Sequence, residues 1–288
     1  MWAAPTAQWL DGDRLHLQHG PIDLVLRAWG AASAVRDAYD AAIARFQTVL
    51  PELAGELAEL RKPMSARPQV ETPVAQRMVT ACRPHAGMFL TPMAAVAGAV
   101  ADEILWVMTE AAPLDRAFVN NGGDIAVHLT EGERLEIALA ADFSRGPIPS
   151  LNGRLTFSHG DGIGGIATSG AQGRSFSLGI ADSVTVLARD AAGADAAATL
   201  IANAVDLDHP AIGRKPASAL DPDSDLGDLP VTVSVGELTR DEIAVALEAG
   251  LQRADQLRKR GLIRDAALAL RGEVVTLGPF TRMRELRP

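Results

Sequence analysis

The most regular hydrophobic pattern of the chain predicts a buried helix with a polar stripe. Residues 190–205 (DAAGADAAATLIANAV) are mostly alanine and aliphatic, and within them Asp195, Thr199 and Asn203 recur every four residues. Side chains at this spacing share one face of a helix. A helix so apolar is largely buried, and its carboxylate, hydroxyl and amide groups therefore need partners. Neighbouring backbone groups could be those partners, or a metal ion or polar ligand could be.

Hydrophobic periodicity elsewhere predicts a mixture of helices and strands. Alternation over Leu15–Leu26, broken by a Gly-Pro pair, predicts a hairpin. Helical spacing from Val35 to Leu50 predicts a helix that Pro51 ends. Other helices are expected to start at Thr91-Pro92 and at the Thr239/Glu242 capping box, and other strands at 125–129, 135–141, 154–158, 183–188, 231–235 and 273–277. This order favours an α+β fold, taken as one unit over 1–288 with candidate lobes 1–110 and 111–288.

Composition narrows the class of protein. The chain has 288 residues, 48% of them hydrophobic, and a net charge of −9, as expected for a soluble globular protein that binds neither nucleic acid nor an anionic membrane. Cys82 is the single cysteine, which excludes an intrachain disulfide and any multi-cysteine metal site. The start of the chain lacks a signal-peptide pattern, so a cytoplasmic protein is expected. The apolar run Met88–Val100 is followed by Asp102 and Glu103, short of the roughly 20 residues that span a membrane.

Two segments rich in glycine are candidate ligand loops. VNNGGDI (119–125) indicates a tight turn at a strand end, where glycines allow a close approach of the backbone to a ligand. A plain turn without function is the alternative. Residues 164–182 (GGIATSGAQGRSFSLGIAD) fit a loop that wraps an anion or a polar heterocycle. The segment has no phosphate-binding loop motif.

Taken in order, several motifs resemble those of the ApbE-like superfamily, whose best-known members are FAD:protein FMN transferases. They are PMAAVAGAVAD (92–102), VNNGGDI (119–125), ATSG (167–170) and DSVTVLA followed by ADAAAT (182–188 and 194–199). The likeness is greatest to a small, poorly characterised branch and covers roughly residues 85–206. It implies a tunnelling-fold-like architecture, in which an antiparallel sheet packs with helices.

The resemblance also implies a magnesium site and a change in chemistry. The side-chain ligands would be Asp195 and Thr199, with the carbonyl of Val96 as the third ligand, and hard oxygen ligands suit magnesium. The lysine of the transferase motif is replaced here by Ala97, and the histidine-containing HIIDP-like segment is absent. Flavin transfer is therefore not expected. Flavin binding is not expected either, since aromatic residues make up only 4% of the chain.

The candidate site residues follow from these segments. His85, in the loop before the small-residue helix, is a candidate general acid or base, together with Asp124 and Asp195 as catalytic carboxylates. Turn capping is the alternative role for Asp124 and for Asp182. Arg83 and Arg174 are the cations expected to meet a carboxylate or phosphate. The full set of candidate ligand-binding residues is Arg83, Asn120, Asn121, Gly122, Gly123, Thr168, Ser169, Gly170, Arg174, Ser175, Ser177, Asp182 and Asn203.

Three function hypotheses remain from the sequence. The first is an enzyme acting on a small polar heterocyclic or carboxylated metabolite, with a hydrolytic or hydration step in which a carboxylate–histidine–metal site activates water. The second is a flavin transferase, and the third is a non-catalytic ligand- or flavin-binding protein. Apolar helices at 92–109 and 239–260 favour a homo-oligomer, most simply a dimer.

Overall fold

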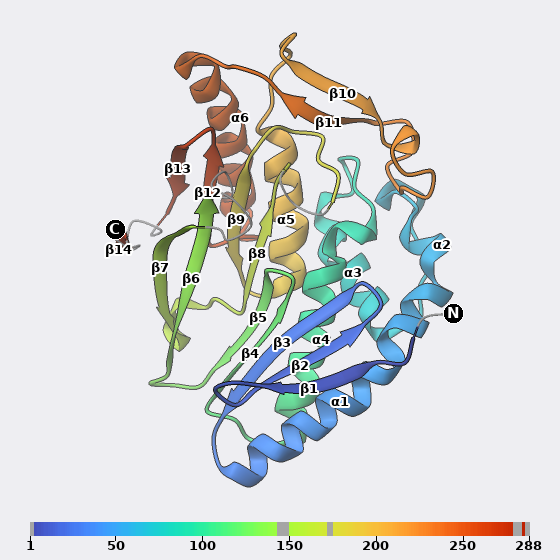
Figure 1. Ribbon diagram of the computed structural model, residues 1–288, viewed down its shortest axis with the longest axis vertical. Helices are drawn as coiled ribbons and strands as arrows, with labels where there is room; N and C mark the ends of the chain where they lie inside the picture. Colours follow the sequence, from blue (N-terminus) through green and yellow to red (C-terminus); the bar gives the residue numbers. More distant parts are fainter. Residues whose placement is uncertain (1–2, 143–149, 172–174, 279–283, 286–288) are drawn as a thin grey trace. The chain divides into compact units, whose positions relative to one another are not determined.

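The computed structural model describes residues 3–142, 150–171, 175–278 and 284–285 (Figure 1). Its internal contacts divide the chain into two compact units. Unit 1 comprises Met1–Leu135, Phe157–Ala167 and Ala188–Ala196, and unit 2 comprises Glu136–Thr156, Thr168–Leu187 and Ala197–Pro288. Each unit is thus assembled from separate stretches of sequence. The lobes expected from the sequence stay a prediction.

Unit 1 is built on an antiparallel sheet. Its strands, in spatial order, are β1 (Thr6–Leu10), β2 (Arg14–His19), β3 (Ile22–Trp29), β4 (Arg116–Asn121), β5 (Asp124–Leu129) and β8 (Gly165–Ser169). The expected hairpin is β2–β3, in which Leu15 pairs with Leu26. Strand β3 then pairs with β4, which is distant in sequence, with Leu26 opposite Val119. Alternate residues of β2 and β3 are buried, as a sheet with one covered face requires.

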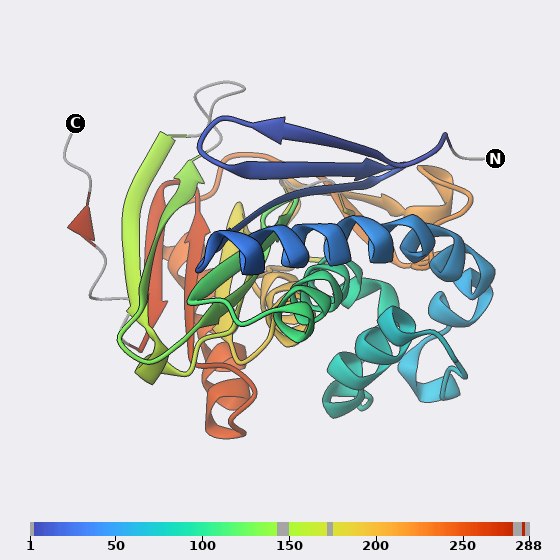
Figure 2. The ribbon, with the colours of Figure 1, turned by 90° about the horizontal axis from the view of Figure 1, so that it is seen from below.

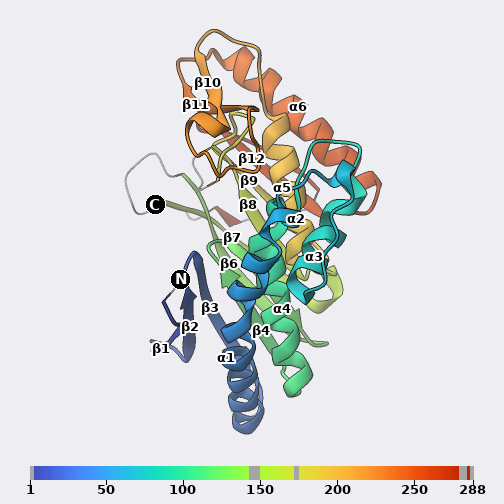
Figure 3. The same ribbon diagram turned by 90° about the vertical axis from the view of Figure 1, so that its right-hand side faces the viewer.

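Helices cover one face of this sheet. They are α1 (Ala32–Gly55), α2 (Leu57–Leu60), α3 (Pro73–Cys82) and α4 (Val96–Ala111), with 3₁₀ turns at Met64–Ala66, Arg83–His85, Pro92–Ala95 and His159–Asp161. Helix α1 lies along the strands β2 and β3 and beside α4, as Figures 2 and 3 show. Phe46 of α1 and Ile104 of α4 are fully buried in this core, as are Leu24 and Leu26 of β3. The second face of the sheet carries the half-buried residues of the same strands.

Pro51 does not end α1, contrary to the expectation from sequence. The helix continues through Pro51 to Gly55, and Val49, Leu50 and Leu53 are all buried. A proline inside a helix removes one backbone hydrogen bond. Burial of the apolar residues on both sides of Pro51 offsets that loss, so tertiary packing decides where the helix ends.

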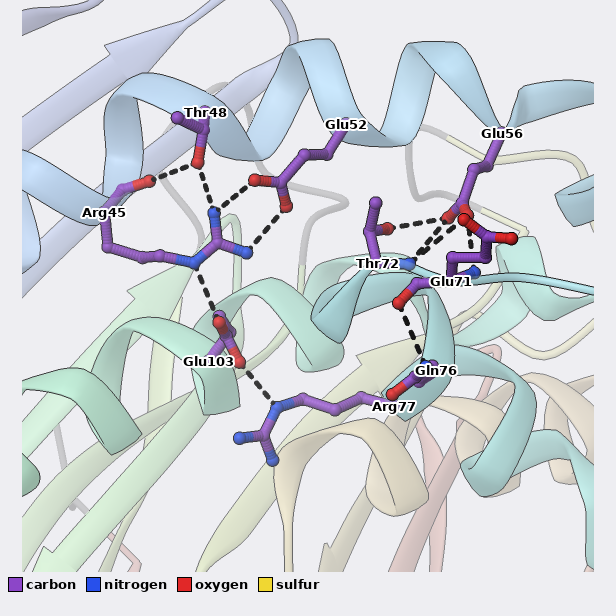
Figure 4. A network of polar contacts seen from close by, with 9 residues as sticks. All are labelled: Arg45, Thr48, Glu52, Glu56, Glu71, Thr72, Gln76, Arg77 and Glu103. Atoms are coloured by element: carbon purple, nitrogen blue, oxygen red, sulfur yellow. Dashed lines mark hydrogen bonds and ion pairs between the residues drawn. The ribbon is translucent and has the colours of Figure 1, made fainter.

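A buried acidic residue joins three helices of unit 1 (Figure 4). Glu103 of α4 is 1% exposed, and its two carboxylate oxygens accept hydrogen bonds from Arg45 of α1 at 2.8 Å and from Arg77 of α3 at 2.9 Å. Arg45 also forms a bidentate pair with Glu52. A buried carboxylate is tolerated only when it is paired in this way. The network fixes α1, α3 and α4 to one another.

Unit 2 holds a second group of strands and helices. Strands β9 (Ser183–Ala188), β12 (Asp265–Leu270) and β13 (Glu273–Leu277) are antiparallel, with β12 in the middle. Strands β6 (Arg134–Asp142), β7 (Ser150–Ser158) and β14 (Arg284–Glu285) form a three-stranded sheet, and β10 (Ile212–Pro216) pairs with β11 (Pro230–Val235). Helix α6 (Arg240–Lys259) packs on β12 and β13 and begins with the expected capping box of Thr239 and Glu242. Helix α5 (Ala191–Ala204) runs from unit 1 into unit 2.

Helix α4 is longer than the apolar run Met88–Val100 suggests, because Asp102 and Glu103 lie inside the helix. The segment Pro92–Ala111 is long and apolar enough to cross a membrane by length and composition alone. More than half of its most apolar window is buried inside the protein, as in the core helix of a globular fold.

Candidate functional site

The VNNGGDI motif forms the β4–β5 hairpin turn. Gly122 and Gly123 have positive φ angles of 63° and 116°, which L-residues with side chains rarely adopt, and the Gly123 amide donates to Oδ1 of Asn120 at 2.8 Å. Asn121 and Asp124 pair directly across the two strands, so both side chains lie on the same face of the sheet. They are 5% and 9% exposed. The glycines thus act as a turn, and its two flanking polar residues point inward.

The first turn of α4 meets this buried pair. Nδ2 of Asn121 donates to the carbonyl of Ala97 at 3.1 Å, and the amide of Gly98 donates to Oδ2 of Asp195 at 3.1 Å. Gly98 touches α5 so closely that a Cβ atom there would lie 2.3 Å from the carbonyl oxygen of Ala191. Helices α4 and α5 therefore pack in close contact at Gly98. As a result, α4, α5 and the β4–β5 hairpin meet at one polar cluster within unit 1.

The electrostatics of Asp195 set this cluster apart. The pKa of Asp195 is raised well above its usual value, first by burial of the carboxyl group and then by the negative charge of Asp124. Hydrogen bonds from the Gly98 and Ala97 amides lower the pKa but do not cancel these effects. The residue as a whole keeps some exposed surface, while its carboxyl group is enclosed by protein. Two interacting carboxyl groups in such surroundings are typical of acid–base or cation sites.

A second carboxylate closes the N-terminus of α5. Asp102 of α4 accepts the amides of Ala191 and Ala192 at 2.9 and 2.8 Å, while Oδ1 of Asp190 accepts the amide of Gly193 at 2.7 Å. Burial raises the pKa of Asp102 to about 7, although the two amide hydrogen bonds act in the opposite direction. The free amides of this helix end are therefore already occupied by protein carboxylates. Asp102 was missed as a site-supporting residue, although it ends the PMAAVAGAVAD motif.

Cys82 and His85 lie at the end of α3 and in the turn after it, and both are buried. The Cys82 thiol donates to the Thr91 carbonyl at 3.5 Å, and burial followed by the charge of Asp195 raises the pKa of this thiol far above its usual value. A thiol with so high a pKa is not a nucleophile near neutral pH. A catalytic role for His85 stays a prediction. Arg83, in the same turn, is exposed.

In unit 2, protein groups already satisfy Asn203. Its Oδ1 accepts the amide of Leu178 at 3.0 Å and the hydroxyl of Ser177 at 3.5 Å. Ser177 in turn accepts the amide of Gly179. For this member of the polar stripe, the structure therefore shows the neighbouring backbone as its partner. Thr199 is half-buried, and its role as a metal ligand stays a prediction.

A single loop was expected over residues 164–182, but the structure does not show one continuous loop there. Residues Gly165–Ser169 form β8, and the absence of a side chain at Gly165 permits close contact with the backbone of Asp190 and Ala191. Thr168, on this strand, shares a hydroxyl hydrogen bond with Thr185 at 2.9 Å, and Gly170 lies against the Asp182 backbone. Asp182 accepts the Arg271 amide, as the capping alternative predicts. Ser175 is exposed, and Arg174 lies outside the described residues.

Within the part of the chain that the structure describes, no three His, Cys, Asp or Glu side chains cluster as they would around a metal ion. A magnesium ion, however, is commonly held by one or two carboxylates together with neutral oxygens and water. The Asp124–Asp195 pair remains compatible with such a site.

Comparison with known proteins identifies relatives of the chain. A family model described as "AbpE bacteria" matches residues 7–276. A UPF0280 protein of Methanothrix thermoacetophila is 41% identical over 134 residues, which are 46% of this chain and 52% of that protein. A UPF0280 protein of Methanopyrus kandleri is 36% identical over 137 residues, 48% of this chain and 51% of that protein. The chain thus spans about half the length of the curated relatives it matches.

Solved structures show the same fold. An ApbE protein from Thermotoga maritima superimposes with a TM-score of 0.51 over 98% of both chains, at 12% sequence identity. Likeness at this identity concerns the fold alone, and it confirms the ApbE-like α+β architecture expected from the sequence.

Proposed function

Because this chain belongs to the bacterial AbpE family of ApbE-like proteins, we propose that it is an enzyme whose reaction centre is the Asp124–Asp195 carboxyl pair. The observation that supports this proposal is the raised pKa of Asp195, which has burial and the charge of Asp124 as its main causes. Two enclosed carboxylates repel each other unless a proton or a cation lies between them. The pair is therefore suited to exchanging a proton or to holding a hard cation.

The donor set at this pair fits magnesium. The resemblance to the transferases suggests Asp195 and Thr199, one turn apart on α5, together with the Val96 carbonyl at the start of α4. Carboxylate, hydroxyl and carbonyl oxygens are the donors that magnesium prefers, and its charge would relieve the repulsion between Asp124 and Asp195. Magnesium bound there would supply positive charge to an anionic group of the substrate. The protein supplies the fixed geometry through Gly98 and Asn121.

The proposed substrate is a small polar metabolite that carries a heterocycle or a carboxylate. We assign the general-base role to the carboxyl pair: a carboxylate whose pKa is raised above its usual value accepts a proton from water more readily than an ordinary aspartate does. The water would then add to an electrophilic carbon of the substrate in a hydrolysis or hydration step. The second candidate function is flavin transfer, which the family resemblance favours. Ala97, at the position of the transferase lysine, has no polar side chain; its amide donates to Asp195 and its carbonyl accepts from Asn121.

A metal-binding measurement tests the reaction centre. Magnesium should raise the melting temperature of the wild-type protein and give a saturable calorimetric titration, whereas Asp195→Asn and Asp124→Asn should bind it at least about tenfold more weakly. Asp37→Asn, which removes an exposed carboxylate of α1, is the matched control and should behave as wild type. Wild-type protein that does not bind magnesium would refute the metal site.

A metabolite screen then separates the enzyme from a scaffold. Asp195→Asn should abolish turnover while keeping the fold, as judged by circular dichroism. A sharply lowered melting temperature with unchanged ligand recognition would instead make Asp195 a structural residue. Incubation with FAD, magnesium and an acceptor peptide tests the second function, because a fluorescent acceptor band would place flavin transfer first.

A further inference from the structure

The open face of the unit 1 sheet carries two arginines stacked on one tryptophan. The guanidinium carbons of Arg27 and Arg116 lie 4.5 and 4.4 Å from the ring centroid of Trp29. The register explains the cluster, since Trp29 of β3 pairs with Arg116 of β4 and Arg27 pairs with Phe118. The alternate residues of β3, such as Leu26 and Ala28, are buried. The cluster therefore lies on the face opposite α1 and α4 (Figure 2).

Among the described residues, only Arg116 of these two cations forms an ion pair, with Glu133. In the described part of the chain, Arg27 forms no ion pair, and its Nε atom is enclosed without a hydrogen-bond partner. The nearest carboxylate oxygen to Arg116 belongs to Glu133, at 3.6 Å, which is too long for a good hydrogen bond. This local excess of positive charge occurs in a chain whose net charge is −9.

A third guanidinium adds to the positive charge of this face. Leu15 of β2 pairs with Leu26 of β3, so Arg14 lies next in register to Arg27. Nε of Arg14 donates to the carbonyl of Asp11, which positions the side chain without neutralising it. Like charges on adjacent strands repel each other and destabilise a sheet unless something offsets them.

The geometry of the stack suits oxyanions. A guanidinium that lies over an aromatic ring keeps N–H groups along its edge for a carboxylate or phosphate, which it can bind through two parallel hydrogen bonds. Trp29 is itself supported by Phe118, with ring centroids 6.0 Å apart. Arg116 donates from Nη1 to the carbonyl of Arg134 at 3.0 Å and keeps 31% of its side chain exposed, so part of the guanidinium group faces solvent.

We propose that the Arg27–Trp29–Arg116 cluster is a binding site for a small polyanion that carries at least two phosphate or carboxylate groups. The charge of such a ligand complements the unpaired guanidinium group of Arg27 and that of Arg116, which has only a long contact with Glu133. The site is separate from the Asp124–Asp195 pair, because Asn121 and Asp124 point towards the helices whereas Trp29 and Arg116 occupy the other face of the same sheet. The proposal therefore stands independently of the proposed reaction.

Titration with inorganic pyrophosphate tests the site. Wild-type protein should bind pyrophosphate saturably by calorimetry and gain thermal stability, and potassium chloride at the same ionic strength should give neither effect. The double variant Arg27→Gln/Arg116→Gln should bind at least about tenfold more weakly. Arg36→Gln, which removes one exposed arginine of α1, controls for the loss of a surface charge and should bind as wild type. Citrate in place of pyrophosphate distinguishes a polycarboxylate from a phosphate ligand.

Other outcomes would overturn the proposal. Equal pyrophosphate affinity in wild type and the double variant, or no saturation in wild type up to about 1 mM, would make the stack purely structural. If the double variant is unfolded, Arg116→Lys provides the decision. Arg116→Lys keeps the positive charge but loses the paired donors, so we expect weaker pyrophosphate binding with an unchanged fold. Unchanged affinity would contradict the proposal.

Discussion

The Gly98 amide donates to Oδ2 of Asp195 at 3.1 Å, and this bond ties the first turn of α4 to an enclosed carboxyl group of the polar cluster. It is possible only because the two backbones approach so closely at Gly98. The position of the carboxylate therefore depends on the absence of a side chain on the neighbouring helix.

Gly98→Ala should destabilise the protein by about 3 kcal/mol or more, because the new methyl group would meet the Ala191 backbone rather than a flexible side chain. Chemical denaturation measures the change. Gly87→Ala is the control, since nothing lies within 4 Å of the added Cβ atom. Magnesium binding should weaken in the first variant only. Equal stability of both variants would show that α4 and α5 can separate without cost.

Asp102 should make the unfolding free energy depend on pH. Its pKa is about 7 in the folded protein against 3.8 for the free side chain, so between these values the folded state holds a proton that the unfolded chain has lost. Stability from this group is therefore greatest at low pH, falls as the pH rises from about 4 to about 7, and is constant above that.

Asp102→Asn should flatten this part of the stability–pH curve, because the neutral amide has no proton to lose as the pH rises. Thermal melts across the pH range provide the comparison, and subtraction of the variant curve from the wild-type curve removes the contributions of other groups. Asp37→Asn should keep the wild-type slope. A slope that survives in Asp102→Asn would assign the proton to another residue.

Glu103→Gln should destabilise the protein by about 3 kcal/mol, because Arg45 and Arg77 would lose the carboxylate that neutralises them. The exposed Glu110 on the same helix gives the matched control, and Glu110→Gln should change stability by no more than about 0.5 kcal/mol. Magnesium affinity should be unaffected in folded protein. A stable Glu103→Gln variant would mean that the helices hold together by apolar packing alone.

Asn203→Ala should cost about 1–3 kcal/mol, since it leaves the Leu178 amide without its acceptor. Magnesium binding by the folded variant should match that of wild type, because the partners of Asn203 are protein groups. If magnesium or metabolite binding is lost while the melting temperature is unchanged, Asn203 belongs to a ligand site instead.

Hydrophobic periodicity was sufficient to predict those helices and strands whose positions depend on their own residues and on the residues next to them. The β2–β3 hairpin and the strands β9 and β13 follow from alternation and turn residues, and the start of α6 follows from its capping box. The end of α1 could not be predicted, because burial beyond Pro51 decides it. The partner of β4 could not be predicted, because β3 lies about 90 residues earlier in the chain and such pairing leaves little local signal.

The candidate site, too, could be predicted only in part from the sequence. Asp195, Asn121 and Asp124 stood out as polar residues in apolar or glycine-rich surroundings, and the structure places them together. Asn203 stood out for the same reason but is satisfied by a nearby loop, because the helical stripe indicates burial and not the identity of the partner. The stack of Trp29 with Arg27 and Arg116 requires a register that a single sequence does not contain.

The two-glycine turn between β4 and β5 also limits how the length of this hairpin can vary. Asn121 and Asp124 face α4 because each strand alternates its side chains between the two faces of the sheet. A single residue inserted between Asn121 or Asp124 and the rest of its strand would shift the alternation of that strand by one position. A neighbouring residue would then occupy the buried position in place of the amide or the carboxylate. A variant of this hairpin should therefore keep the carboxyl pair only if residues are inserted or deleted in pairs within the strands, or if the change lies within the turn itself.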